Sequence, residues 1–195
     1  MKLVFATANL NKAKEIQVLM PASIEILSLN DIHCTADIPE TQPTIEGNAS
    51  QKAFYIYEKY HQNCFADDTG LEVDALNGKP GVFSARYAGE AKDANANMDK
   101  ILAEMKGVTN RNAKFKTVIS LVINGEEQQF EGIVNGVILE QKRGNQGFGY
   151  DPIFLPDGYT RSFAEMTLAE KNAVSHRAKA VAELVKYLNS LETSM

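Results

Sequence analysis

The sequence predicts an α/β protein in which helices pack on a β-sheet, and three observations carry this prediction. Short apolar or β-branched runs, which are typical of strands, are interspersed with segments whose apolar residues recur at helical spacing. The first run is followed by a helical pattern and then by a second run, which is a βαβ-like opening. An Asn-Gly pair between two later strand-like segments indicates a hairpin.

The first third of the chain supplies two strands and two helices. Leu3 to Ala6 and Ile24 to Leu29 are short apolar runs that predict strands. The helix predicted between them has its apolar face at Ala13, Ile16, Leu19 and Met20. Asn48 to Tyr60 predicts a second helix, whose other face is polar.

The middle of the chain is less regular. Cys64 to Ala66 reads as the end of a buried strand, and Leu71 to Leu76 shows strand-like alternation. Asp67 to Gly70, between these segments, predicts a turn because two acids lead into a glycine. A further amphipathic helix is indicated by Met98, Ile101, Leu102 and Met105.

The second half predicts a hairpin and a C-terminal helix. Lys114 to Ile123 is rich in β-branched residues, and Asn124-Gly125 leads from it into Gln128 to Leu139. A two-residue turn of this kind predicts that the two strands are antiparallel. Thr167 to Glu170 is a capping-box signature for a helix start. The last helix has its apolar stripe at Ala178, Val181, Val185 and Leu188.

Composition restricts the classes of function. The 195 residues, 44% of them hydrophobic, are enough for one folding unit with a substantial core. No segment has the length of a membrane span, and the spacing of Cys34 and Cys64 fits no metal or redox motif, so we expect a cytoplasmic protein. The net charge of −5 argues against a nucleic-acid binder. A phosphate ligand would need local cations and a metal to screen the carboxylates.

Thr7 to Lys12, between the first strand and the first helix, is a candidate phosphate site. Amide N–H groups at a helix start carry partial positive charge, and Lys12 adds a full one. The segment lacks the glycine spacing of a Walker P-loop. An ordinary polar turn with asparagine caps is the alternative.

The adjacent acids Asp67 and Asp68 are the next candidates. An apolar run leads directly into them, which solvation alone explains poorly, and Mg²⁺ prefers carboxylate oxygens. Glu40, in a polar loop, is a possible partner for the same cation. The alternative is that both aspartates brace a turn.

Two later segments could bind a base. Gly144 to Pro152 is a glycine-rich loop in which Phe148 and Tyr150 are expected to be exposed and could stack on a planar ring. The alternative is that these aromatics pack back on the core. Lys171 to Arg177 contains pure hydrogen-bond donors, which fit acceptor edges such as a purine 6-keto oxygen; a solvated joint between helices is the alternative.

Taken in order, these segments resemble the inosine triphosphate pyrophosphatase family, whose members act on inosine, deoxyinosine and xanthosine triphosphates. The likeness covers nearly the whole chain. The motifs that carry it are Thr7-Ala8-Asn9-Leu10-Asn11-Lys12, Ala66 to Gly70, Pro80 to Tyr87, Phe148 to Pro152 and Ser175-His176-Arg177.

The resemblance implies an elongated mixed sheet flanked by helices, in two lobes of a single domain, with the nucleotide in a central cleft and usually a homodimer. The triphosphate would be held by Thr7, Ala8, Asn9, Leu10, Asn11, Lys12 and Lys52. Glu40 and Asp68 would bind Mg²⁺, with Asp68 the catalytic base, Asp67 in support and Thr69 touching the substrate. Phe148 would stack on the purine, and the rest of the base site would comprise Gly149, Tyr150, Asp151, Lys171, His176 and Arg177.

Two positions depart from the family pattern. Gly47 replaces the glutamate that many members have before Asn48, so no metal role carries over to it, although Glu46 could compensate. Ala8 stands where glycine is frequent, which matters little if the backbone there avoids positive φ.

The expected reaction is Mg²⁺-assisted attack of water at the α–β phosphoric anhydride, which releases the monophosphate and pyrophosphate. Rival interpretations are a pyrophosphatase for modified pyrimidines or 7-methylated guanine, a nucleotide sensor without catalysis, and an RNA-binding or scaffold protein. Motif order disfavours the other pyrophosphatase, and the intact acids disfavour the sensor. The net negative charge disfavours the RNA-binding or scaffold protein.

Overall fold

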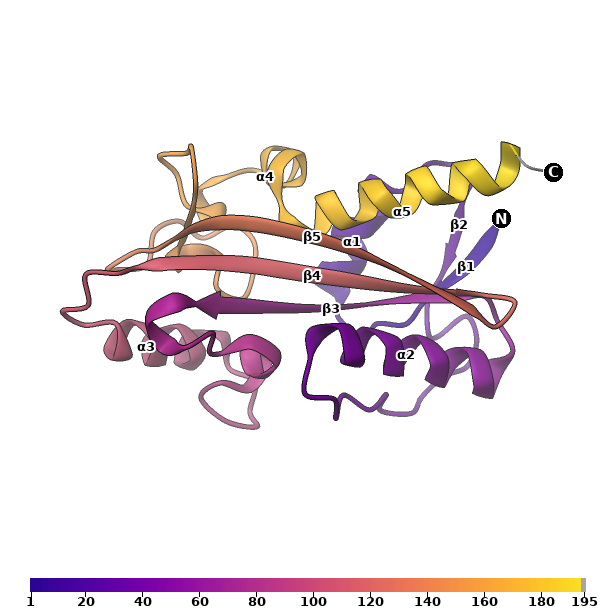
Figure 1. The fold of residues 1–195 in the computed structure, drawn as a ribbon, viewed down its shortest axis with the longest axis horizontal. Coiled ribbons are helices and arrows are strands. Elements are labelled where there is room, and N and C mark those ends of the chain that lie inside the picture. Colours follow the sequence, from indigo (N-terminus) through magenta and orange to yellow (C-terminus); the bar gives the residue numbers. More distant parts are fainter. Residues whose placement is uncertain (194–195) are drawn as a thin grey trace. The chain divides into compact units, whose positions relative to one another are not determined.

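The structure, a computed structural model, describes residues 1–193 and contains a six-stranded sheet with helices packed on it (Figure 1). The strands are β1 (Lys2–Phe5), β2 (Glu25–Leu27), β3 (Cys64–Val73), β4 (Asn112–Ile123), β5 (Glu126–Ile138) and β6 (Phe154–Pro156). The α-helices are α1 (Leu10–Leu19), α2 (Ile45–Tyr60), α3 (Ala94–Glu104), α4 (Leu168–Val174) and α5 (His176–Thr193). Four short 3₁₀ helices are η1 (Asp74–Leu76), η2 (Gly81–Arg86), η3 (Asp151–Ile153) and η4 (Phe163–Glu165).

The sheet is mixed, in the order β2-β1-β3-β4-β5-β6, which confirms the predicted α/β class. β1 runs parallel to both β2 and β3, as a βαβ opening requires, whereas β5 runs antiparallel to β6. Asn124 and Gly125 join the neighbouring strands β4 and β5 with φ of 52° and 88°. Positive φ at both positions is the geometry of a type I′ hairpin turn, so this prediction is confirmed.

The chain forms two compact units whose segments alternate along the sequence. Unit 1 comprises Met1–Asp68, Thr117–Gly132 and the chain from Arg177 onward, and unit 2 comprises Thr69–Lys116 and Ile133–His176. Unit 1 has two hydrophobic cores and unit 2 has one, and β3, β4 and β5 each contribute residues to both units. The functional clusters are therefore described unit by unit.

In unit 1 the alternation of side chains along β1 builds two cores. Leu3 and Phe5 face α1 and α5, and the Phe5 ring stacks on Phe65 of β3 with centroids 4.6 Å apart. Val4 and Ala6 point to the opposite face, where α2 packs. Figure 1 shows α2 on one face of the strands and α5 on the other.

Unit 2 is organised around an aromatic core. The ring of Phe115 on β4 packs edge-on against Phe154, at a centroid separation of 4.7 Å, and Phe163 joins them. Met98 and Ile101 of α3 close the same core. The predicted apolar face of this helix is confirmed, because both side chains are buried.

The predicted turn at Asp67–Gly70 is wrong, because these residues lie inside the ten-residue strand β3. Asp67 and Asp68 are only 1% and 8% exposed. Charged side chains are tolerated in a strand interior when opposite charges meet them there, and those charges come from residues distant in the sequence. The β3 strand ends at Val73, so the expected alternation to Leu76 is replaced by η1.

The helix boundaries refine the sequence prediction. α2 begins at Ile45, before the expected Asn48, because the Thr44 hydroxyl caps it by accepting from the Gly47 N–H. The capping box at Thr167 and Glu170 is confirmed, and it starts the short helix α4, which is separate from α5. Within residues 1–193, no helix combines the length and the apolar character needed to cross a membrane.

Candidate functional site

The loop that opens α1 presents short polar side chains. The Thr7 hydroxyl accepts from the Asn9 N–H at 3.1 Å, and the Asn9 side chain accepts from the amides of Asn11 and Lys12. Asn9 is thus the N-cap of α1, as the alternative interpretation of this segment proposed. Ala8 is absent from the residues with positive φ, so its departure from the family pattern requires no backbone strain.

Asp67 lies at the centre of a buried charge cluster in unit 1. Its Oδ1 accepts from Lys12 Nζ at 3.1 Å, and its Oδ2 accepts from Nε and Nη2 of Arg177 at 3.2 Å each. The third guanidinium nitrogen, Nη1, donates to Glu15 on α1. Glu15 and Arg177 are 3% and 1% exposed, so the two carboxylates hold the guanidinium away from water.

Asp68 heads a second group of charges in the same unit. Its Oδ2 accepts from Asn48 Nδ2 at 3.2 Å, and its Oδ1 lies 3.6 Å from Lys52 Nζ. Lys52 also donates to Glu40 Oε1 at 2.5 Å. The structure therefore brings the two predicted metal ligands, Glu40 and Asp68, around one ammonium group, and Lys52 and Asn48 reach them from one face of α2.

Burial and neighbouring charges shift the pKa values of this cluster in different directions. Burial alone would raise the pKa of Asp67, but Lys12, Arg177 and Lys52 outweigh it and hold that pKa well below its usual range. Burial raises the pKa of Asp68, which Lys52 and Lys12 offset only in part. Of the two adjacent carboxylates, Asp68 is therefore the better proton acceptor.

The atoms around Gly47 explain why a glutamate does not fit at this position. A Cβ added to Gly47 would approach Gln42 Cβ to 2.8 Å and the Thr44 hydroxyl oxygen, which caps α2, to 3.0 Å. Any side chain here would require the segment before α2 to shift. Glu46 is half-buried in the first turn of α2, and its compensating role stays a prediction.

Unit 2 contains the predicted base-binding residues other than Arg177, and Lys171 and Asp151 form a second buried cluster there. Lys171 Nζ donates to Asp151 Oδ2 at 2.7 Å, and both side chains are 3% exposed. The same carboxylate oxygen accepts from the Phe148 N–H at 2.9 Å, and Lys171 Nζ lies 4.7 Å from the Phe148 ring centroid. Gly147 has φ of 71°, and a Cβ there would meet Asp151 Oδ2 at 2.1 Å. The glycine is thus required for the loop to close on Asp151.

Three observations in this region bear on the sequence interpretation. Tyr150 is 5% exposed and its hydroxyl donates to the Ser84 carbonyl, so the expectation of an exposed aromatic is wrong for Tyr150; Phe148 is half-buried. The stretch from Lys171 to Arg177 is mostly buried, which excludes a solvated joint. The His176 ring packs on Phe115 with centroids 4.5 Å apart.

The remaining predicted residues fall as follows. Thr69 and Gly149 are half-buried and belong to unit 2, whereas Ala8, Leu10 and Asn11 are exposed in unit 1. Arg177, expected to read the base with Lys171 and Asp151, belongs to unit 1, where its guanidinium contacts Asp67 and Glu15.

Two residues of the unit 1 cluster were not identified from the sequence. Glu15 lies three residues after Lys12 on α1, beside the buried Ile16. A charged residue next to the apolar face of a helix is the sequence signal that could have identified it. Asn48 offered a similar signal at the start of α2, where a 2% exposed carboxamide precedes buried alanines. Their partners are 162 and 20 residues away in sequence, so the pairings themselves were not predictable.

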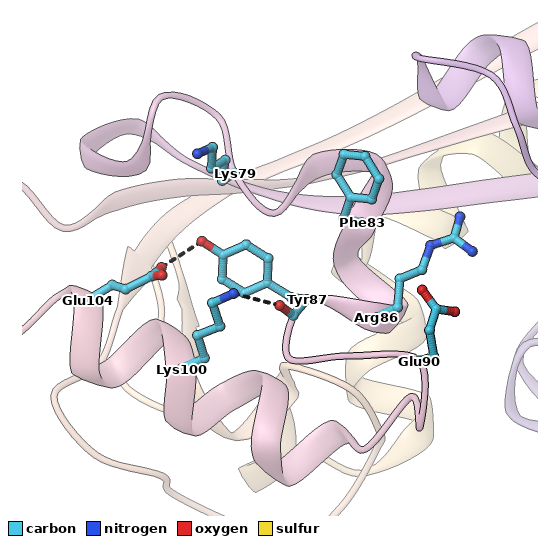
Figure 2. Close-up of a pocket in the computed structure, with 7 residues that line it drawn as sticks. All are labelled: Lys79, Phe83, Arg86, Tyr87, Glu90, Lys100 and Glu104. Carbon is cyan, nitrogen blue, oxygen red and sulfur yellow. Dashed lines mark hydrogen bonds between the residues drawn. The ribbon is translucent and has the colours of Figure 1, made fainter.

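Unit 2 also contains a hollow of about 480 Å³ (Figure 2). Its walls come from residues 79–90, which include η2, and from α3. Tyr87 donates to Glu104 at 2.6 Å, and Lys100 donates to the Tyr87 carbonyl at 2.8 Å. Phe83, at its edge, is 58% exposed. None of the residues predicted to hold phosphate, metal or base lines this hollow.

Known proteins resemble this chain over nearly its whole length. A dITP/XTP pyrophosphatase of Flavobacterium psychrophilum is 59% identical over 190 residues, which cover 97% of this chain and all of the relative. The dITP/XTP pyrophosphatase of Bacillus subtilis is 44% identical, with 96% of both chains covered. Among solved structures, the Ham1 protein of Staphylococcus aureus superposes with a TM-score of 0.89 at 37% identity, covering 97% of this chain and 99% of that one.

The sequence profile of the Ham1 family matches residues 3–187, which include all five motifs on which the resemblance was based. The resemblance to the inosine triphosphate pyrophosphatases is thereby confirmed, and the matching solved structures place the mixed sheet within the same fold. The chain belongs to the Ham1 family.

Proposed function

We propose that this protein hydrolyses non-standard purine nucleoside triphosphates, namely ITP, dITP and XTP, to the monophosphate and pyrophosphate. The observation that carries the proposal is Asp68, a buried carboxylate held by Asn48 and Lys52 beside Glu40. A carboxylate in this setting can take a proton from an attacking water while the ammonium groups stabilise the phosphate oxygens. The names of the relatives support this substrate class.

The charge balance of the unit 1 cluster fits a polyphosphate that arrives with a metal ion. The cations Lys12, Lys52 and Arg177 face the carboxylates of Glu15, Glu40, Asp67 and Asp68. Three positive charges against four negative ones leave the cluster slightly acidic, so a bare triphosphate would be repelled. We propose that Thr7, Asn9, Lys12 and Lys52 contact the phosphates, with the exposed loop residues Ala8, Leu10 and Asn11 offering backbone groups.

The donor set fits Mg²⁺. Within the described part of the chain, no three or more His, Cys, Asp or Glu side chains are grouped so as to hold a metal ion. Mg²⁺ does not need such a cage, because it keeps several waters and is held by one or two carboxylates plus substrate phosphates. Glu40 and Asp68 are the two carboxylates that would hold it. When bound, the ion would polarise the phosphate oxygens and lower the pKa of water.

The unit 2 cluster supports a purine with a 6-keto group. Lys171 can only donate hydrogen bonds, so it fits a keto oxygen and disfavours an amino group. The Phe148 ring beside it supplies a stacking surface. We propose that Asp151, Gly149, Tyr150 and His176 complete the base site and that Thr69 touches the substrate. With Tyr150 in the core, its contribution is limited to its backbone.

Arg177 requires a separate assignment. We propose that it braces Asp67, because its guanidinium donates to both Asp67 and Glu15 in the buried cluster. Its predicted contact with the purine edge would require the guanidinium to leave these two carboxylates. Since breaking a buried ion pair exposes uncompensated charge, bound nucleotide would have to supply equivalent contacts.

The proposed reaction is tested with a panel of triphosphates. Purified protein is incubated with dITP, XTP, dGTP and dATP, with Mg²⁺ or with EDTA, and the products are separated by ion-exchange chromatography. We expect monophosphate and pyrophosphate in equal amounts from dITP and XTP, dependence on the metal, and much slower turnover of dATP. Production of nucleoside diphosphate and orthophosphate, or hydrolysis of dATP at the same rate as dITP, would contradict the proposal.

We further propose a cytoplasmic homodimer. Cys34 and Cys64 are both buried free thiols, which a reducing compartment preserves. Phe83 is a large apolar side chain that is 58% exposed, and such positions are frequent in subunit interfaces. Light scattering coupled to size-exclusion chromatography measures the mass directly, and a monomer at micromolar concentration would exclude the dimer.

A further inference from the structure

Asn172, on the last turn of α4, is a buried carboxamide that the fold does not satisfy. It is 8% exposed, and neither its Oδ1 nor its Nδ2 has a hydrogen-bond partner among the residues that the structure describes. Burying a polar group without a partner is unfavourable, and such groups are few in folded proteins. Where they persist, a bound molecule is one of the explanations that physical chemistry allows.

The other buried asparagines show that this fold can satisfy a carboxamide. Asn97 in unit 2 is 3% exposed; its Oδ1 accepts from the Ala88 N–H at 2.6 Å and its Nδ2 donates to the Ala85 carbonyl at 3.0 Å. Asn48 likewise accepts from Gln42 and donates to Asp68. Asn172 differs from both, so burial of an amide in this protein does not by itself explain it.

The neighbourhood of Asn172 in the chain is the proposed base site. Lys171, the adjacent residue, is buried with its ammonium on Asp151 at 2.7 Å and near the Phe148 ring. These groups already satisfy one another in part, since Asp151 also accepts from the Phe148 amide. Asn172 therefore has the most unused hydrogen-bonding capacity of the polar side chains in this segment whose contacts are described.

We propose that Asn172 binds the edge of the purine, donating from Nδ2 to the 6-keto oxygen and accepting at Oδ1 from the N1–H. The inference rests on the proposed function, because that function supplies a base with a neighbouring acceptor and donor. A carboxamide offers the complementary pair. If the carboxamide is flipped so that its oxygen and nitrogen exchange places, it also matches the amino group and N1 of adenine. Asn172 therefore contributes affinity for the base, whereas Lys171, which can only donate, contributes the preference for keto purines.

The test compares Asn172→Leu with the wild type, using IMP and ribose 5-phosphate as probes in isothermal titration calorimetry. Leucine has a similar size and needs no hydrogen bond. We expect the Kd for IMP and the KM for dITP to rise about tenfold, a change typical for one lost hydrogen-bonding pair. The affinity for ribose 5-phosphate, which has no base, should stay the same. The melting temperature without ligand should not fall, because the Asn172 carboxamide makes no hydrogen bond to the described part of the protein.

Asn97→Leu is the matched control. It removes a buried carboxamide whose partners are protein groups, so it should lower the melting temperature and leave the Kd for IMP unchanged. Asn172→Asp adds a readout that a structural role would not move. A carboxylate accepts from two donors, so the ratio of IMP to GMP affinity should shift toward GMP, whose N1–H and 2-amino group are adjacent.

The outcomes separate this inference from the proposed function. An unchanged Kd for IMP in Asn172→Leu, together with a lower melting temperature, would overturn the inference and leave the pyrophosphatase activity intact. Wild-type protein that binds IMP through Asn172 but hydrolyses no triphosphate would reject the proposed function and retain the base contact. An absence of IMP binding to the wild type, together with no hydrolysis of dITP or XTP, would reject both.

Discussion

At the scale of single residues, the two adjacent aspartates on β3 divide two tasks between them. Asp67 accepts from Lys12 and Arg177, whereas Asp68 has a raised pKa and faces Lys52 and Glu40. Successive residues of a strand point to opposite faces, so neighbours in sequence reach different partners. In the proposed reaction, this alternation would let Asp67 anchor the cations while Asp68 takes a proton from water.

We predict that Asp68→Asn lowers the turnover of dITP by about 100- to 10,000-fold, the range for loss of a general base. The amide keeps the size of the side chain and the contact with Asn48, so nucleotide affinity should change little. Steady-state kinetics gives the turnover, and calorimetry with IMP gives the affinity. Asp37→Asn, at an exposed position of the same unit, is the control and should retain full turnover. Wild-type turnover in Asp68→Asn would remove Asp68 from the reaction.

The buried pair of Glu15 and Arg177 leads to a prediction about stability. Glu15→Ala leaves Arg177 buried with one carboxylate fewer, which should lower the free energy of unfolding by about 3–5 kcal/mol. The exposed pair of Lys2 and Glu25 is the comparison, since its side chains are 68% and 56% exposed. Glu25→Ala should change stability by no more than about 1 kcal/mol. Urea unfolding measures the free energy of unfolding of both variants. Equal losses would show that burial does not determine how much the pair of Glu15 and Arg177 contributes to stability.

At the scale of elements, the capping box of α4 predicts a dependence on pH. Hydrogen bonds from Arg161 and from Thr167 lower the pKa of Glu170 from its ordinary value of 4.5 to about 2. A depressed pKa stabilises the folded state fully above the ordinary value, and the stabilisation is lost as pH falls toward the folded value. Glu170→Gln should therefore be less stable than wild type at pH 7, with the difference constant down to about pH 5 and shrinking below it.

Urea unfolding of both proteins between pH 7 and pH 3.5 measures that difference. Subtracting the free energy of unfolding of one protein from that of the other at each pH cancels the contribution of the carboxylates that both proteins contain. Glu183→Gln, on the exposed surface of α5, is the control and should give a difference near zero at every pH. A Glu170→Gln difference that stays the same below pH 4 would mean that the capping box does not depend on the ionised side chain.

The strands and helices were predictable where local patterns decide them. The apolar run of β1, the apolar face of α3, the turn at Asn124-Gly125 and the capping box of α4 are all local signals. The centre of β3 was not predictable in this way, because Asp67, Asp68 and Gly70 have the composition of a turn. What places Asp67 in a strand is Lys12, 55 residues away, and Arg177, 110 residues away.

The candidate site was predictable to the same extent. Motif order predicted functional roles for Lys12, Asp68 and Lys171, but motifs carry no information about which side chains meet. The position of Tyr150 in the core and the role of Glu15 depend on packing between distant segments. A pattern of residue types therefore predicts which residues are candidates, and the tertiary contacts show the partner of each side chain.

At the scale of the whole molecule, the alternation of the two units along the chain leads to a prediction about cooperativity. β3 contributes Phe65 to a core of unit 1 and Leu71 to the core of unit 2, and β4 contributes Ile119 and Phe115 in the same way. A strand that unfolds in one unit cannot stay fully ordered in the other, because its hydrogen bonds form a continuous ladder. We therefore expect one unfolding transition for the whole chain.

Cavity variants in each core test this expectation. Ile101→Ala in unit 2 and Leu184→Ala in unit 1 remove buried methyl and methylene groups from residues that are 0% exposed. Each should lower the free energy of unfolding by about 2–5 kcal/mol. In calorimetry each variant should show a single peak at a lower temperature, with the calorimetric and van't Hoff enthalpies equal. Val18→Ala, at a 64% exposed position, is the control and should leave the peak in place. A variant that split the peak in two, with one half still melting at the wild-type temperature, would show that the units unfold independently despite their shared strands.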